Sequence, residues 1–239
     1  MDLHDITLLG AESIAEGTSA FRFTKPEGFD FVPGQFANFT LVDPPAMDEA
    51  GPLRTFSIAS APHETALLVA TRMRPSAFKT ALAALPAGAR LEMEGPFGEF
   101  ALEPGDRPAA FVAGGIGITP FLSILRHEAH AGSTREIALY YGNRTPEAAA
   151  FLGEIDAFAS RLPRFRVVHC MSDPACLARG WTGEKGFMDE KFLARHAGDP
   201  AVPLWYVVGP PAMTQAMHEV LVSLGVGDAD LRVEDFAGY

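Results

Sequence analysis

The sequence lacks several features that would assign it to a common class of protein. Its 239 residues include only two cysteines, Cys170 and Cys176, whereas an iron–sulfur cluster takes about four. Their spacing fits neither a CxxC redox motif nor a zinc knuckle, which predicts two reduced structural thiols. Basic residues are scarce as well. The formal net charge of −11 argues against nucleic acid as the main partner, because binding a phosphate backbone requires a basic face.

Long apolar runs and targeting signals are also missing. The most apolar stretch, residues 109–125, is interrupted by Gly and Pro and is too short to span a bilayer. The first ten residues carry acids where a secretory signal carries basic residues. We therefore expect a cytoplasmic protein without membrane insertion, and the hydrophobic content of 48% is sufficient for a packed core.

The first part of the chain has the pattern of an antiparallel barrel. Short β-type segments alternate with Gly/Pro turns such as KPEG and GPFG, and many short strands at this spacing indicate a closed or nearly closed barrel. One helix interrupts them at residues 76–88, with Ser76 as its N-cap. The predicted strands are residues 6–9, 18–24, 35–40, 54–59, 66–72 and 90–94.

After EPGDRP, residues 103–108, strands alternate with helices. Near-continuous apolar strands separated by helices predict a parallel sheet covered on both faces. The expected strands are residues 109–114, 136–142, 165–170, 203–209 and 231–236, and the helices lie near 120–130, 146–160, 188–197 and 211–224. We expect an antiparallel β-barrel domain at 1–104, followed at 105–239 by an α/β domain with a five-stranded parallel sheet of order 3-2-1-4-5.

The loop AGGIGITPF follows the first parallel strand. It has glycines at Gly115 and Gly117, while Pro120 stands where a dinucleotide fingerprint has its third glycine. Glycines allow a pyrophosphate to approach the backbone. We expect Thr119 to cap the next helix and Pro120 to take its first position, so that the helix N-terminus faces an anion. The alternative is an ordinary tight turn between strand and helix.

A second loop, VGPPAM, follows the fourth parallel strand with Gly209, Pro210 and Met213. In the order 3-2-1-4-5 the first and fourth strands are neighbours at the point of reversal, where ligands bind. The two loops together predict a dinucleotide site. Asn143 and Arg144 end the second strand, where the adenosine ribose is usually recognised. A cation there favours NADP over NAD, and the alternative is a solvated surface arginine.

RTFS, GGIGITP, VGPPAM and a terminal VEDF, in this order, resemble the ferredoxin–NADP(H) reductase family of flavoproteins. The resemblance extends from PGQF, at residue 33, to the end of the chain. It implies a flavin-binding β-barrel and an NAD(P)-binding α/β domain, with NADPH or NADH as hydride donor. FAD is favoured over FMN, although Arg74 and Pro75 replace a glycine of the family's phosphate loop. Val208 also stands where many members have cysteine.

The resemblance assigns roles to individual residues. Arg54 would bind the flavin pyrophosphate and Phe56 would lie along the isoalloxazine, both from one face of an alternating strand. Ser57 would hydrogen-bond near N5, the atom that takes the hydride. Ser76 would take the serine position of the phosphate loop, with Arg74 or Lys79 nearby. The remaining expected flavin contacts are Thr55, Thr71, Arg72, Ala77, Phe236 and Tyr239.

Near the C-terminus, Glu234 and Phe236 resemble the acid and the aromatic that many members place beside the flavin. Ser57 and Glu234 are therefore the candidate catalytic residues. Tyr239 can share the role of Phe236, and the alternative for Phe236 is a core aromatic at a strand end.

The sequence thus predicts a flavin-dependent NAD(P)H oxidoreductase that passes a hydride to bound FAD and then electrons to a separate acceptor. The acceptor would be ferredoxin, flavodoxin, an oxygenase component or a small molecule. One alternative is an NAD(P)H:flavin reductase that uses free flavin. Another is a non-catalytic electron-transfer or nucleotide-sensing subunit of a larger complex. An acidic ferredoxin would need a local basic patch, for which the candidates are Arg72, Arg74, Lys79 and Lys185.

Overall fold

The computed structural model describes residues 3–44, 46–178 and 180–236, which form two compact units. Unit 1 contains the described residues up to Leu102 together with Thr119–His127. Unit 2 contains Glu103–Ile118 and the described residues from Glu128 onward. The domains predicted from the sequence meet at residue 104, and residues 119–127 fall in the second of them, whereas in the structure these residues belong to unit 1.

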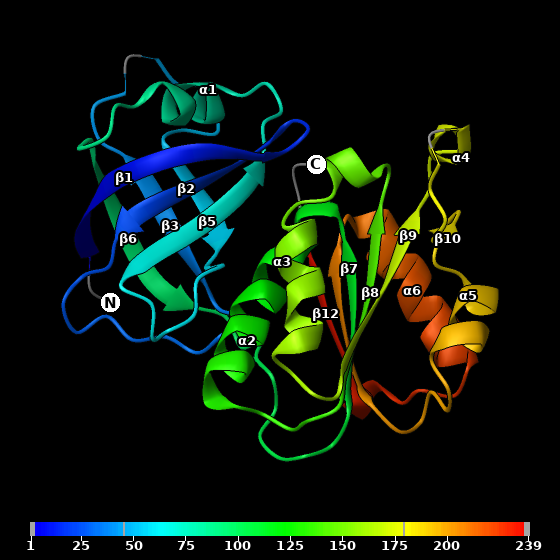
Figure 1. The fold of residues 1–239 in the computed structure, drawn as a ribbon. Helices are drawn as coiled ribbons and strands as arrows, with labels where there is room; N and C mark the ends of the chain where they lie inside the picture. The colour runs from blue at the N-terminus through cyan, green and yellow to red at the C-terminus, as the bar shows by residue number, and fades with distance from the viewer. Residues whose placement is uncertain (1–2, 45, 179, 237–239) are drawn as a thin grey trace. The chain divides into compact units, whose positions relative to one another are not determined.

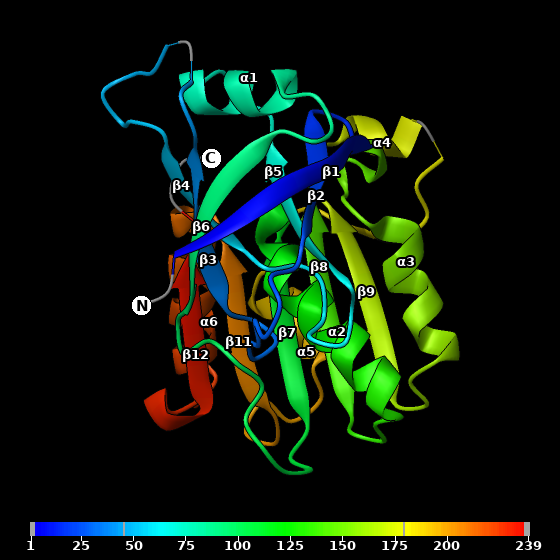
Figure 2. The same ribbon diagram turned by 90° about the vertical axis from the view of Figure 1, so that its left-hand side faces the viewer.

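Unit 1 is an antiparallel β-barrel. Its six strands lie in the order β4-β3-β6-β1-β2-β5 (Figures 1 and 2). After β4 the chain pairs with β5, because Ala59 N donates to Leu68 O at 2.7 Å and Leu68 N donates to Ser60 Oγ at 3.1 Å. The strands are β1 (Leu3–Ala15), β2 (Thr18–Thr24), β3 (Phe36–Leu41), β4 (Leu53–Ser57), β5 (Ala66–Arg72) and β6 (Arg90–Phe97). The predicted barrel is confirmed, with a longer β1 than expected.

Helix α1 (Ala77–Ala84) lies between β5 and β6. Its predicted N-cap is confirmed, because the Ser76 side chain accepts a hydrogen bond from Lys79 N at 3.1 Å. The apolar face of the helix buries Phe78 and Leu82 in the core of the barrel, among Phe residues of β2 and β3. Phe78 also packs against Phe56 of β4, with 6.0 Å between the ring centroids, which fixes the start of α1 relative to that strand.

The segment Thr119–His127 of helix α2 (Ile118–Ala131) also contributes to unit 1. Ser123 Oγ donates to Ser60 O at 2.7 Å. Arg126 pairs with Glu64 at 3.4 Å, and its side chain is only 12% exposed. These contacts hold the segment that follows β4.

Unit 2 is built on a parallel sheet of order β10-β9-β8-β7-β11-β12 (Figures 1 and 2). The strands are β7 (Ala109–Gly114), β8 (Ile137–Asn143), β9 (Phe165–Met171), β10 (Glu184–Lys185), β11 (Leu204–Gly209) and β12 (Leu231–Asp235). The predicted order 3-2-1-4-5 is confirmed for β7, β8, β9, β11 and β12, and β10 adds a sixth strand at the edge. Every residue of β7 and β11 is buried, as expected for the centre of a sheet with two covered faces.

Helices cover both faces of this sheet. Helix α3 (Leu152–Ala157) lies on one face, and α5 (Glu190–His196) and α6 (Pro211–Ser223) lie on the other (Figure 1). The expected helix at 146–160 is wrong in detail, because Phe151 has a left-handed backbone with φ of 58° and interrupts it. The 3₁₀ turns Pro146–Ala148 and Phe158–Ser160 flank α3, and the short α4 (Ala175–Ala178) was not predicted.

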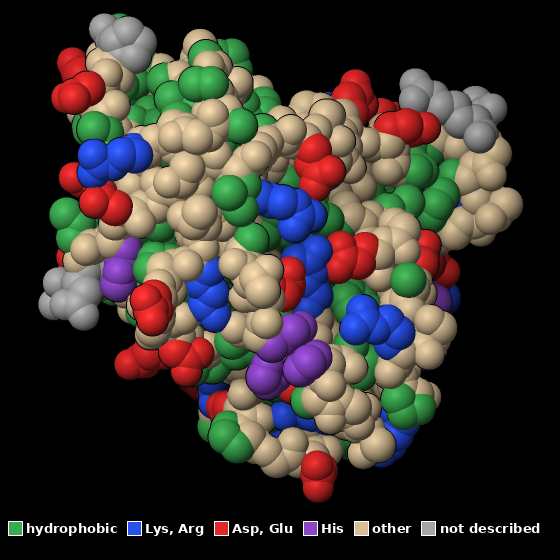
Figure 3. Space-filling model, turned by 60° about the vertical axis from the view of Figure 1, so that its left-hand side comes forward, with side chains coloured by type: hydrophobic (Ala, Val, Ile, Leu, Met, Phe, Trp, Pro, Cys, Tyr) green, Lys and Arg blue, Asp and Glu red, His purple; other side chains and the backbone are tan. Residues whose placement is uncertain are grey.

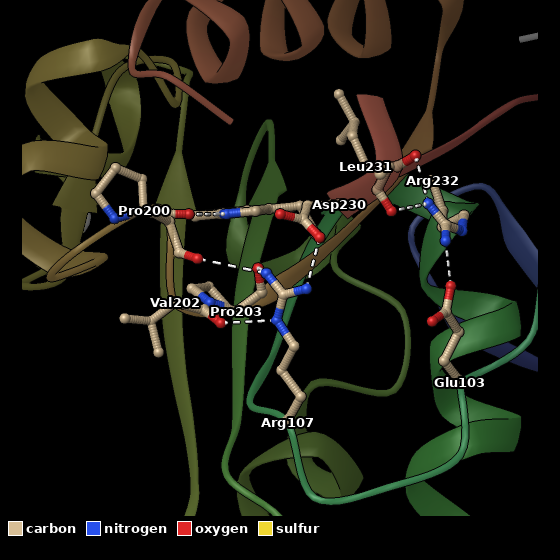
Figure 4. A network of polar contacts seen from close by, with 11 residues as sticks. Glu103, Arg107, Pro200, Val202, Pro203, Asp230, Leu231 and Arg232 are labelled. Atoms are coloured by element: carbon tan, nitrogen blue, oxygen red, sulfur yellow. Dashed lines mark hydrogen bonds and ion pairs between the residues drawn. The ribbon is translucent and has the colours of Figure 1, made fainter. Parts of the chain in front are cut away.

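The chain that enters unit 2 is held by arginines (Figure 4). Arg107 pairs with Asp230 at 2.5 Å and donates to Val202 O at 3.0 Å. Glu103 pairs with Arg232. The buried Arg135 donates to the carbonyls of Arg107 and Glu103, both at 2.6 Å. Glu103 and Arg107 therefore anchor this segment within unit 2.

Within the described residues, no helix has both the length and the hydropathy needed to cross a membrane. On the face shown in Figure 3, Lys and Arg side chains are interspersed with Asp and Glu.

Candidate functional site

The two Gly/Pro loops of unit 2 are packed against each other at the carboxyl end of the sheet. Strand β7 pairs in parallel with both β8 and β11, so the strand order reverses there. A Cβ atom on Gly117 would lie 2.5 Å from Val208 O, and one on Gly114 would lie 2.2 Å from Met213 Sδ. The predicted neighbourhood of the loops is correct. The Val208 backbone requires glycine at position 117, whereas the nearest obstacle at position 114 is the flexible Met213 side chain.

The start of α2 differs from the prediction. A 3₁₀ turn at Gly115–Gly117, with Gly115 at a φ of 55°, leads into α2, whose N-cap is Gly117 without a side-chain cap. The expected capping by Thr119 is therefore wrong, and Pro120 is the third helical residue instead of the first. The first turn of a helix has N–H groups without intrahelical partners, so proline is tolerated there.

The end of β12 lies beside the second loop. Val208 and Gly209 pair with Glu234 and Asp235 in the parallel register, and Phe236 N donates to Gly209 O at 3.0 Å. Thr214 Oγ1 lies within hydrogen-bonding distance of both the Asp235 carboxylate and Pro211 O, and its single proton can be donated to either. Glu234 and Phe236 are thus held at the edge that carries the two loops, and their predicted place beside a flavin stays a prediction. Tyr239 lies outside the described residues.

Glu234 has an unusual electrostatic environment. Its Oε2 atom is buried without a hydrogen-bond partner among the described residues. Burial raises the pKa of the Glu234 carboxyl to about 7, because removal from water disfavours the charged form. The group can therefore exchange a proton near neutral pH.

At the end of β8, Asn143 is 7% exposed, and neither polar atom of its side chain has a partner among the described residues. A buried amide of this kind usually has hydrogen-bond partners, so Asn143 can bind a polar ligand group. The Arg144 side chain is 81% exposed and lies 3.7 Å from the Asp173 carboxylate. At the end of β8 the Arg144 cation therefore lies beside the Asp173 carboxylate, whereas the sequence predicts only the cation there.

Phe187 was not predicted. It is 81% exposed and follows β10, whose Lys185 pairs with Met171 of β9 in the register of Asn143. Next to it, Met188 lies against Gly142, since a Cβ there would come 2.8 Å from Met188 Cε. Phe187 thus lies at the carboxyl edge of the sheet with its side chain exposed. A Phe in a polar loop gives no sequence signal, because its exposure depends on the fold.

In unit 1, β4 positions the RTFS residues. Arg54 and Phe56 both contact Phe78 of α1, with the guanidinium 5.2 Å and the Phe56 ring 6.0 Å from its centroid. The predicted shared face is therefore correct. Phe56 packs on the barrel core and remains partly exposed, while Ser57 is 7% exposed. Thr55 Oγ1 donates to Asn38 Oδ1 at 2.7 Å.

The structure brings Arg54 and the N-terminus of α1 to one carboxylate, that of Asp48. Arg54 Nη2 lies 3.3 Å from Asp48 Oδ1, and Ala77 N donates to Asp48 Oδ2 at 3.2 Å. The remaining contacts of the Arg54 guanidinium are with the carbonyls of residues 50, 51 and 53. A guanidinium and a helix N-terminus that converge in this way form an anion site.

The other predicted flavin contacts of unit 1 lie at the end of β5 and at the start of α1. Thr71 is buried, and the Arg72 carbonyl accepts from Lys79 Nζ at 2.7 Å. Ser76 uses its hydroxyl oxygen to cap α1. A flavin-binding role for these residues stays a prediction.

The comparisons with known proteins agree with this geometry. Residues 111–219 match the family model described as the oxidoreductase NAD-binding domain. The propane 2-monooxygenase reductase component of Rhodococcus jostii is 30% identical over 84% of this chain and 54% of the relative. Residues 111–219 therefore match an NAD-binding oxidoreductase domain, and the chain has the fold of ferredoxin–NADP(H) reductase-like flavoproteins.

Two further proteins show how far the similarity extends. A relative in Methylococcus capsulatus, one of the subunits of its Na⁺-translocating NADH-quinone reductase, is 29% identical over 80% of this chain and 50% of the relative. The ferredoxin NADP⁺ reductase of Neisseria gonorrhoeae, in a structure with bound FAD and NADP, has a TM-score of 0.82, is 19% identical and covers 98% of both chains. The chain spans about half the length of the curated relatives it matches.

Proposed function

We propose that this chain takes a hydride from NADH or NADPH on unit 2 and delivers it to FAD on unit 1, from which electrons pass to a separate acceptor. The proposal is carried by the packing of the two loops at Gly117 and Val208, at the reversal point of an NAD-binding sheet. The relatives are named as reductases or reductase components, which supports the same activity.

The flavin half of the proposal uses the residues of unit 1. Bound FAD and nicotinamide supply the redox chemistry, and the protein supplies binding and orientation. The Arg54 guanidinium and the Ala77 amide would hold the flavin phosphates. Ser57, whose side chain has no hydrogen bond to a described residue, would donate to the flavin ring.

The nucleotide half uses the carboxyl edge of unit 2. The backbone of the Gly115–Gly117 turn and of the second loop would hold the pyrophosphate. Asn143 and Arg144 would meet the adenosine ribose, and the exposed ring of Phe187 would stack on the adenine. Asp173 lies beside Arg144. The Asp173 carboxylate would accept a hydrogen bond from a ribose 2′-hydroxyl, whereas a 2′-phosphate would be attracted by Arg144 and repelled by Asp173.

The acceptor would be another component of a multicomponent system or a small molecule. The Rhodococcus jostii relative is named as one component of a monooxygenase and the Methylococcus capsulatus relative as one part of a quinone reductase. A chain that covers about half of such relatives would rely on further segments or proteins for electron delivery.

An anaerobic titration tests the proposed function. The protein is reconstituted with FAD, and NADH or NADPH is added while the flavin absorbance is followed. We expect bleaching by at least one of the two nucleotides. Absence of bleaching with both would reject the activity and favour a non-catalytic nucleotide-sensing subunit.

A flavin reductase that uses free flavin is the second candidate. The contact of Asp48 with Arg54 and Ala77 favours it, because a carboxylate in the anion site would weaken retention of a phosphate-bearing flavin. Gel filtration of the reconstituted protein separates the two candidates. FAD that elutes with the protein supports a bound cofactor, whereas complete loss of FAD supports a diffusing substrate.

A further inference from the structure

Asp48 lies on the segment between β3 and β4, and its carboxylate contacts two elements outside that segment. Oδ1 lies 3.3 Å from Arg54 Nη2 of β4, and Oδ2 accepts from Ala77 N, the first residue of α1, at 3.2 Å. Oδ1 also accepts from Ala50 N at 3.1 Å, within the same turn. The carboxylate therefore joins a guanidinium to a helix N-terminus, which are two groups that bind phosphate.

The surroundings of Asp48 carry an excess of positive charge. The pKa of Lys79 is lowered by burial and by the charges of Arg74 and Arg54, so the three cations lie close enough to influence one another. Among the described residues, Asp48 is the only carboxylate in an ion pair with any of the three. The three cations and the one carboxylate form a cluster with net positive charge, although the whole chain has a charge of −11. The cluster can therefore bind an anion that carries more than one negative charge.

A phosphate and the Asp48 carboxylate cannot both take the Ala77 amide and the near side of Arg54. Two anions at this separation repel each other, and one amide N–H can serve only one strong acceptor. The side chain of Asp48 is 41% exposed. It can therefore rotate into solvent when another anion binds to Arg54 and the Ala77 amide. The segment that carries it contains exposed residues on both sides.

We propose that Asp48 holds the place of a flavin phosphate and must be displaced when a phosphate-bearing flavin binds, so that this residue sets how tightly the flavin is retained. This inference rests on the proposed function, since it takes the ligand of unit 1 to be a flavin nucleotide. It makes Asp48 a determinant of affinity for the phosphate part of the ligand and leaves the ring part unaffected.

The test is a binding titration of the flavin-free protein with FAD, FMN and riboflavin, followed by flavin fluorescence. The variant Asp48→Asn removes the charge and keeps the shape. Its matched control is Glu49→Gln, which changes the neighbouring exposed carboxylate, a group without a partner among the described residues. We expect FAD and FMN to bind Asp48→Asn about tenfold more tightly than wild type, the combined size of an exposed ion pair and a helix-terminus interaction. Riboflavin affinity should be unchanged, and Glu49→Gln should match wild type throughout.

A second variant, Asp48→Ala, removes the acceptor as well as the charge, and circular dichroism checks that each variant is folded. Weaker FAD binding by both variants would mean that Asp48 orients Arg54 for ligand binding, and it would overturn the inference. An equal gain for riboflavin would overturn it too, because the effect would then not concern phosphate. If neither wild type nor the variants bind any of the three flavins, the proposed function fails. If wild type binds FAD and the variants do not differ from it, only the inference fails.

Discussion

Replacing Glu234 with Gln should change how the stability of unit 2 depends on pH. Burial raises the pKa of the Glu234 carboxyl from 4.5 to about 7. Between these values the unfolded chain is ionised at this residue while the folded chain keeps its proton. The unfolded state then binds fewer protons, so the wild type loses stability as the pH rises from about 4.5 to about 7. Gln carries no titrating proton and should not show this loss.

The magnitude follows from the two pKa values. At about 1.36 kcal/mol per pH unit, the whole interval corresponds to about 3 kcal/mol, of which about 2 kcal/mol falls between pH 5.5 and pH 8. The side chain is only partly buried, so solvent screening lowers the expectation to about 1–2 kcal/mol. The sequence pI of about 5.0 makes pH 5.5 a practical lower limit, because proteins tend to precipitate near zero net charge.

Urea unfolding at pH 5.5 and pH 8, followed by tryptophan fluorescence, measures this effect. Trp205 is fully buried in unit 2, and Trp181, the other tryptophan, belongs to the same unit. The stability difference between Glu234→Gln and wild type should widen in favour of Gln by about 1–2 kcal/mol at the higher pH. Glu219→Gln, at an exposed position of α6, is the control and should show no widening. A difference for Glu234→Gln that does not change with pH would refute the reasoning.

Three further substitutions test the site. Gly117→Ala should destabilise unit 2 by about 1–3 kcal/mol, because the new methyl group meets the Val208 carbonyl; urea unfolding should show little change for the control Gly153→Ala, where a Cβ contacts nothing. Phe187→Ser should raise the Kd for NADH at least about fivefold through lost stacking, and an unchanged Kd in calorimetry would remove the ring from the site. Ser57→Ala should slow flavin reduction in stopped flow more than it weakens flavin binding.

The sequence predicted the elements whose pattern is local. Strand β7 is a run of apolar residues that ends in glycine, and its bounds were predicted correctly. The N-cap at Ser76 was equally visible, because a hydroxyl before an apolar helical face is a local signal. The strand order followed from the general rule for alternating strands and helices.

What the sequence did not predict depends on contacts between distant residues. Strand β10 is two polar residues, and Glu184 is held there by Arg195 and His196 of α5. Thr119 is the predicted cap of α2, but the helix follows directly on the 3₁₀ turn at Gly115–Gly117 and begins two residues earlier in the sequence. The Asp48 carboxylate reaches a helix 29 residues away, and a charged residue in a loop carries no sign of such a contact.

Helix α2 contributes residues to both units. This limits how either unit can be replaced by the corresponding unit of another protein with the same fold. The barrel obtains Ser123 and Arg126 from a segment that follows the first strand of the other unit. A gene fragment that stops at residue 104 would leave the Ser60 carbonyl and the Glu64 carboxylate without these partners. The reverse exchange, a new nucleotide-binding unit fused after Leu102, would have to supply a helix with a hydroxyl and a guanidinium three residues apart. Recombination within this fold is therefore constrained by one helix that carries side chains for both units.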